Sequence, residues 1–116
     1  MYLENLKKIY KKKVEKQEQL RKKVLKEALF ALKKLSEHVK FESAYIFGSV
    51  VKPYKFKPDS DVDFAFVRLE KDKLFYTIAF LSNFLERDVD VLEFEKIRKI
   101  PFKEKILKEG VKWKND

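Results

Sequence analysis

The sequence predicts a small α/β or α+β domain in which helices flank a mixed sheet. Three observations support this fold class. A chain of 116 residues suits a single domain with one core. Hydrophobic residues make up 45% of it, enough to fold. Segments with helical and strand-like periodicity alternate along the chain. We therefore expect one domain over residues 1–116, divided into a basic helical extension at 1–15 and a core at 16–113.

A long N-terminal helix is the first predicted element. Residues 1–47 contain neither glycine nor proline, and strong helix formers dominate residues 3–37. In the second half, apolar residues recur at helical spacing and predict packing on the core: Val24, Ala28, Leu32 and Leu35. The first half has only a thin apolar stripe among lysines, which indicates a projecting helix or a partner contact.

The rest of the chain alternates between short strands and helices. Strand-like patterns occupy residues 41–47, 62–67 and 89–94, and a polar stretch with two prolines separates the first two. A helix is expected at 71–86, and a second one opens at Pro101 and ends before Gly110. Residues 111–113 predict a last short strand. The aromatic side chains of the first of these helices are expected in the core or in an oligomer contact, and base stacking is the alternative: Phe75, Tyr76, Phe80 and Phe84.

Composition excludes several classes of site. The absence of cysteine excludes disulfides, thiolate catalysis and cysteine-bound zinc, and the single histidine excludes a site that needs two. No apolar run is long enough for a membrane helix, and the first residues lack a signal-peptide pattern. We therefore expect a cytoplasmic protein without membrane contact. Abundant Lys and Glu with scarce Cys and Gly are typical of a thermophile.

Charge is concentrated near the N-terminus. Of the formal net charge of +9, residues 1–40 carry +8, from 13 basic and 5 acidic residues. Such a segment can attract nucleic acid or an acidic partner, and it can equally be a solvated helix face.

Two polar motifs belong to consecutive predicted strands, one at the end of the first strand and one at the start of the second. Gly48-Ser49 ends the first strand, where backbone N–H groups and a hydroxyl can hold phosphate oxygens, although such a pair alone is also a common turn. Asp61 and Asp63 alternate along the next strand, so both carboxylates should lie on one face. A hard cation such as Mg²⁺ would relieve the repulsion between the two carboxylates. The alternative interpretation is that both aspartates face solvent on an edge strand and bind nothing.

A third carboxylate belongs to the next strand. Asp90 interrupts an apolar run of that strand, where burial of an unpaired charge costs free energy. A second metal ion bound to Asp90 would offset this cost. Asp88 is the other candidate, but we expect it to end the preceding helix.

These motifs together resemble a known signature. Ile46-Phe47-Gly48-Ser49, eleven further residues and then Asp61-Val62-Asp63 resemble the signature of the nucleotidyltransferase superfamily with the polymerase-beta-like fold. Its length and its downstream Asp90 make the chain similar to the minimal nucleotidyltransferase branch, over residues 20–113. The resemblance implies that Gly48, Ser49 and Lys52 bind ATP, and that Asp61, Asp63 and Asp90 bind two Mg²⁺ ions. Relatives often have an Arg-rich sequence after Gly-Ser, but here Val50-Val51-Lys52-Pro53 offers only a lysine.

The resemblance also implies a partner. Members of this branch are often encoded beside a HEPN-domain toxin, so the implied function is an antitoxin that transfers AMP to a tyrosine of that toxin. Two alternatives stay open. One is a nucleotidyltransferase for a small-molecule or RNA acceptor, and the other is a non-catalytic nucleotide-binding protein, which the missing arginine favours. The sequence does not determine the oligomeric state.

Overall fold

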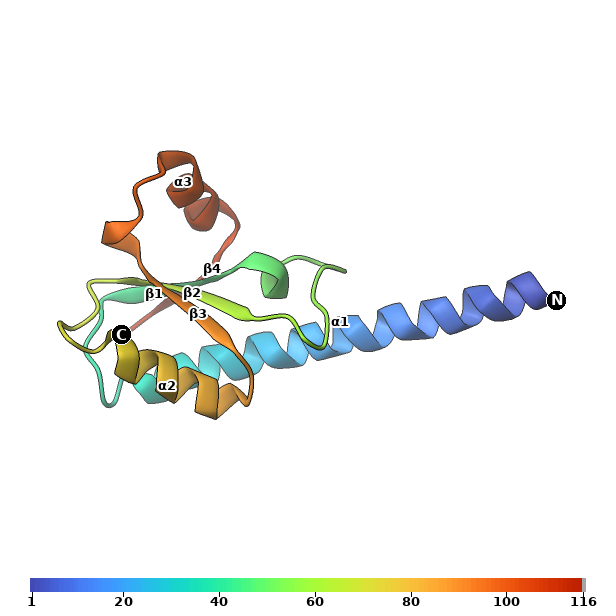
Figure 1. Cartoon of the computed structure of the whole chain (residues 1–116), viewed down its shortest axis with the longest axis horizontal. Coiled ribbons are helices and arrows are strands. Elements are labelled where there is room, and N and C mark those ends of the chain that lie inside the picture. The colour runs from blue at the N-terminus through green and yellow to red at the C-terminus, as the bar shows by residue number, and fades with distance from the viewer. Residues whose placement is uncertain (116) are drawn as a thin grey trace.

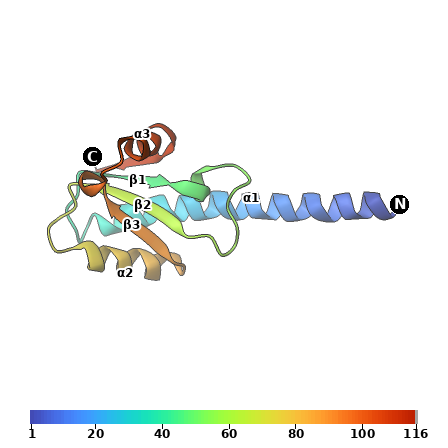
Figure 2. The same ribbon diagram turned by 45° about the horizontal axis from the view of Figure 1, so that its top comes forward.

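The computed structural model describes residues 1–115 as three α-helices, two short 3₁₀ helices and a four-stranded sheet. The sheet is mixed and has the strand order β3-β2-β1-β4. Helices α1 and α2 lie on one face of the sheet and α3 lies on the other (Figures 1 and 2). The predicted fold class is therefore confirmed, including the long N-terminal helix.

Helix α1 (Tyr2–Leu35) is one continuous helix with two different environments. Its second half packs on the sheet because Val24, Ala28, Leu32 and Leu35 are buried. Residues 1–13 are all exposed, and this part of the helix projects beyond the sheet (Figure 1). The helix accounts for the elongated shape of the chain, whose longest dimension is 60 Å. No helix in residues 1–115 is both long and apolar enough to cross a membrane.

Strands β1 (Ser43–Phe47) and β2 (Val62–Val67) form the centre of the sheet. They pair antiparallel, with Phe47 opposite Asp63. The 3₁₀ helix η1 (Gly48–Val51) and a loop connect them. Alternation along β2 places Val62, Phe64 and Phe66 in the main core beneath α1 and α2. The residues between them, Asp63 and Ala65, consequently face the α3 side.

Helix α2 (Leu74–Leu85) joins β2 to the parallel strand β3 (Val89–Glu93). It begins later than predicted because Lys71 and Asp72 form a turn, with Asp72 in the left-handed region at φ 65°. Contrary to the prediction, Asp88 does not end this helix. It lies in the connection just before β3. The aromatic residues of α2 are not core residues as a group: Phe75, Tyr76 and Phe84 are exposed, and only Phe80 packs against the core.

After the 3₁₀ helix η2 (Phe94–Lys96), helix α3 (Ile100–Glu109) leads into β4 (Val111–Lys114), which pairs antiparallel with β1. Gly110 follows α3, as predicted, but its φ of −71° is available to any residue. Glycine is needed there because a Cβ would lie 2.5 Å from the Ile106 carbonyl oxygen and 3.2 Å from that of Ile46. The turn thus brings α3 tightly onto β1.

Candidate active site at the Gly48 turn

The Gly48 turn lies where β1 ends, on the α3 side of the sheet. Gly48 has a φ of +81°, in the left-handed region that favours glycine. A Cβ at this position would collide with Oδ2 of Asp63. Glycine therefore does two things here: it allows the backbone to turn into η1, and it leaves the space that the Asp63 carboxylate occupies.

Three carboxylates meet near this turn. Asp63 of β2 is the register partner of Asp90 on β3, so both side chains lie on the same face of adjacent parallel strands. Asp61 is exposed and lies one residue before β2 begins. Partial burial, the negative charge of Asp90 and then that of Asp61 raise the pKa of Asp63 from 3.8 to about 6. The three predicted acids thus interact electrostatically, with Asp63 at their centre.

The three acids do not form a complete metal site by themselves. Within residues 1–115, no group of three or more His, Cys, Asp or Glu side chains is arranged to hold a metal ion. Mg²⁺ commonly binds to one or two carboxylates and completes its shell with water and substrate phosphates. A half-buried Asp63 beside Asp90 fits such an ion, because a cation would offset the burial and the neighbouring negative charge that disfavour ionisation of Asp63.

A pocket of about 170 Å³ opens beside Gly48, between the turn and α3. Phe47 and Phe102 give it an apolar wall, and their rings meet edge-to-face at 5.7 Å between centroids. Lys52 and Lys105 also line it, and Nζ of Lys52 is 3.9 Å from Oε2 of Glu109. Glu109 lines the pocket as well, so the pocket combines an apolar wall with two cations and one carboxylate, a net positive lining that suits a nucleotide.

Lys105 was not singled out from the sequence. It lies on the polar part of an ordinary amphipathic helix, and no local signal separates it from Lys103 or Lys108. Only the packing of α3 over the Gly48 turn brings it to the pocket. Lys52, by contrast, was predicted from its place just after Gly48-Ser49, and it does line the pocket.

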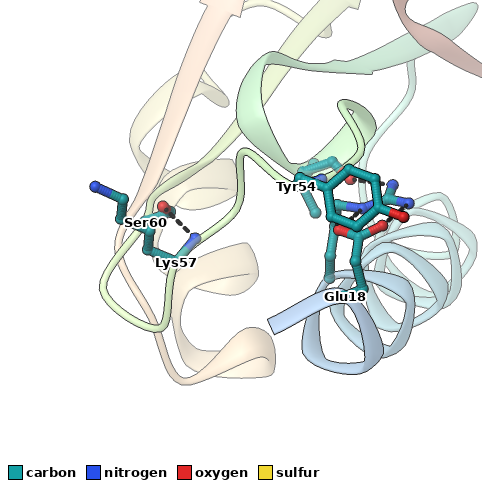
Figure 3. A network of polar contacts seen from close by, with 6 residues as sticks. Glu18, Tyr54, Lys57 and Ser60 are labelled. Atoms are coloured by element: carbon teal, nitrogen blue, oxygen red, sulfur yellow. Dashed lines mark hydrogen bonds and ion pairs between the residues drawn. The ribbon is translucent and has the colours of Figure 1, made fainter. Parts of the chain in front are cut away.

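Helix α1 supports the turn from behind through a buried arginine. Nη1 of Arg21 donates a hydrogen bond of 3.2 Å to the Val50 carbonyl, and its Nε and Nη2 donate to the Glu18 carboxylate. The Tyr54 N–H donates a 2.8 Å hydrogen bond to the same carboxylate (Figure 3). Hydrogen bonds from Arg21 and Tyr54 lower the pKa of Glu18. This network fixes both ends of the segment that follows Ser49.

The loop that leads into β2 has its own support. The Lys57 N–H donates to Oγ of Ser60 (Figure 3), and Nη1 of Arg87 donates a 2.6 Å hydrogen bond to the Ser60 carbonyl. The Arg87 guanidinium also lies over the ring of Phe56, 4.9 Å from its centroid. These contacts hold the residues just before Asp61, so the first acid is placed by the loop and not by a strand.

Comparisons with known structures agree with this fold. In structure, the chain is similar to a mutant of the toxin–antitoxin MntA-HpeT, in which two aspartates two positions apart are replaced by glutamate. The TM-score is 0.58 at 19% identity, over 72% of this chain and 70% of that one. A second similar structure is assigned as a minimal nucleotidyltransferase, with a TM-score of 0.53 at 20% identity, over 84% and 93% of the two chains. No curated protein matches the sequence significantly.

The family itself is identified from the sequence. The model of the family described as polymerase beta, nucleotidyltransferase, matches residues 31–114, which is well over half of the chain. The matched region contains the Gly48 turn, all three acids and the pocket, and it leaves most of α1 outside. The chain belongs to the polymerase beta nucleotidyltransferase family.

Proposed function

We propose that this protein is a Mg²⁺-dependent nucleotidyltransferase that transfers AMP from ATP to a hydroxyl group of a protein partner. One observation carries the proposal: Asp63 lies against Gly48 and beside Asp90, with its pKa raised by burial and by its acidic neighbours. Two like charges held at a turn that can receive phosphate are costly unless a cation joins them. A magnesium–triphosphate complex would supply that cation.

Each part of the site has a proposed role. Asp61, Asp63 and Asp90 would hold Mg²⁺, which polarises the phosphates when bound. The N–H groups and hydroxyl of Gly48-Ser49, with the cations that line the pocket, would bind the triphosphate. In the transfer, the acceptor oxygen bonds to the α-phosphorus, the bond to the bridging oxygen breaks, and pyrophosphate leaves. The Asp90 carboxylate, which is exposed, would accept the hydroxyl proton.

The acceptor we propose is a tyrosine of a HEPN-domain toxin, which makes this chain the antitoxin of a pair. The structural similarity to the antitoxin of MntA-HpeT supports this assignment. So does the spacing of the two aspartates replaced in that mutant, which equals the spacing of Asp61 and Asp63. Asp90 is exposed at the start of β3, so a protein acceptor can reach it without entering a closed cavity.

Transfer is tested with ATP labelled on the α-phosphate, Mg²⁺ and the protein encoded by the neighbouring gene. We expect label on a tyrosine of that partner, lost in Asp63→Asn and retained in Asp59→Asn, because Asp59 is an exposed loop residue. Label on RNA or on a small molecule would instead assign the acceptor to that class. Absence of any transfer, with antitoxin function unchanged in Asp61→Ala and Asp63→Ala, would overturn the enzymatic proposal.

A further inference from the structure

Four aromatic rings form a row on the surface where α1 and α2 meet, on the face of the sheet opposite to α3. The row, which we call the aromatic ladder, consists of Phe30 on α1 and Phe84, Phe80 and Tyr76 on α2. Phe30, Tyr76 and Phe84 are 50%, 44% and 38% exposed. Exposed aromatic groups that cluster in this way mark a binding surface.

The rings of the ladder are ordered with respect to one another. On α2, successive rings are four residues apart and nearly parallel, with centroids 6.3 and 6.2 Å apart and interplanar angles of 27° and 16°. Phe30 continues the row at 5.8 Å from Phe84. Cations lie at both ends, with Nζ of Lys34 5.4 Å from the Phe30 ring and Nζ of Lys73 5.4 Å from the Tyr76 ring.

A row of lysines leads along α1 to this ladder. Six lysines lie within about 40° of the direction of Phe30 around the helix axis, and we call them the lysine stripe: Lys8, Lys12, Lys16, Lys23, Lys26 and Lys34. Among the residues of α1, no acidic side chain lies in this sector. Nζ of Lys23 and Nζ of Lys34 lie 3.9 and 4.0 Å from carboxylate oxygens of Glu27 and Glu37, and ion pairs this open to solvent contribute little in water. From Lys8 to Phe30 the stripe is about 33 Å long.

We propose that the lysine stripe and the aromatic ladder together bind a single-stranded polynucleotide. Proteins that bind such strands combine a positive track for the phosphates with aromatic rings on which bases stack. Both components are present here, on one face of one helix pair, and the track leads to the rings. The stripe repeats its charges along a straight helix without surrounding walls, so it suits an elongated, evenly charged ligand better than a folded acidic protein.

This surface is separate from the proposed active site. The ladder lies on the α1 and α2 side of the sheet, whereas Asp63 and the pocket face α3. Five of the six lysines also lie outside the region that the family model matches. Binding therefore does not depend on nucleotidyl transfer. The Asp63→Asn variant should keep its polynucleotide affinity even where it loses transfer.

Fluorescence anisotropy of labelled U₂₀ and dT₂₀ with the full chain tests the proposal. We expect the affinity to fall steeply with salt, and to fall about tenfold or more in the triple variant K8E, K12E and K16E. The control triple K55E, K57E and K108E changes the net charge equally at exposed sites away from the stripe, so it should lose much less. RNA bound more tightly than DNA would identify RNA as the ligand. Equal binding would show that the surface accepts either kind of single strand.

The ladder is tested by replacing rings with leucine, which keeps apolar packing but removes the π face. We expect Phe30→Leu with Phe84→Leu to weaken U₂₀ binding about tenfold. Phe75→Leu is the matched control, because Phe75 is 84% exposed on the same helix but is not part of the ladder. No binding by the wild type, or equal loss in test and control variants, would overturn the proposal. So would tighter binding of poly-glutamate than of U₂₀, which would assign the surface to an acidic protein.

Discussion

The carboxylate of Asp63 occupies the space that a side chain on Gly48 would fill. Gly48 follows β1 and Asp63 belongs to β2, and the pairing of Phe47 with Asp63 brings them together. The contact couples the backbone turn that would receive phosphate to the acid that would receive the metal. A change in either residue should therefore affect the other.

Replacement of Gly48 by alanine should destabilise the protein and abolish transfer. The variant has a side chain at φ +81° and a clash with Oδ2 of Asp63, so we expect the free energy of unfolding to fall by about 1–3 kcal/mol. Urea denaturation measures this. In an Asp63→Ala background only the backbone strain should remain, because the Asp63 Cβ would be at an ordinary 3.6 Å. Additive effects in the double variant would contradict the coupling.

Stability should depend on pH through Asp63. Its pKa is 3.8 in the unfolded chain and about 6 in the folded one, so the folded state binds more protons between these values. The stability that this group contributes is complete below pH 3.8 and is lost as the pH rises through 6, by up to about 3 kcal/mol. We expect Asp63→Asn to unfold at a higher temperature than wild type at pH 8 and at a similar temperature at pH 4. Asp59→Asn should show no such difference.

Mg²⁺ should restore stability at high pH in the wild type only. Burial and the charges of Asp90 and Asp61 raise the pKa of Asp63, and an ion held between the acids would offset them, so the melting temperature at pH 8 should rise with Mg²⁺ concentration. Asp63→Asn and Asp90→Asn should respond much less than wild type. An equal rise in these variants would show that the ion binds elsewhere.

Lys105 should contribute to nucleotide affinity, although the sequence did not single it out. It lines the pocket beside Gly48 with Lys52. We expect Lys105→Gln to raise the KM for ATP about tenfold, as expected for the loss of one charge-assisted hydrogen bond, with a smaller change in kcat. Lys108→Gln is the control, since Lys108 is exposed on the same helix and does not line the pocket. A similar rise in KM for the control would argue against a direct contact.

Arg21 should act as a positioning residue for the turn. Arg21→Met keeps the apolar stem but leaves the Val50 carbonyl without its donor, so the free energy of unfolding should fall by about 1–3 kcal/mol. In the wild type, the lowered pKa of Glu18 contributes stability above its ordinary pKa of 4.5, and this is lost as the pH falls through the folded value. The variant should lose much of this acid sensitivity, because only the weaker contributions to the Glu18 pKa, such as the Tyr54 N–H, remain. Lys33→Met, at an exposed position of the same helix whose charge does not act on Glu18, should change neither property.

The sequence by itself determined the elements and the local motifs. Periodicity located the helices and strands to within a few residues, because each buries one side against the same core. Gly48-Ser49 and Asp61-Val62-Asp63 could be recognised because they are local, and their meaning depends on strand ends and on alternation along a strand. The largest error was the expectation that the aromatic residues of α2 lie in the core, while the oligomer contact that we also expected stays a prediction. Phe75, Tyr76 and Phe84 are instead exposed, since apolar periodicity does not reveal which neighbours cover a helix.

Tertiary structure decided what the motifs can do together. Strand register, set by pairing over whole strands, places Asp90 beside Asp63 and Asp63 against Gly48. Helix packing brings Lys105 over the turn and Arg21 behind it. Such relationships join residues far apart in the chain, and their energies depend on burial and on distance, neither of which a linear pattern contains. The sequence could therefore name the acids of the site, but only the fold could show that Asp63 is the acid whose charge the other two oppose.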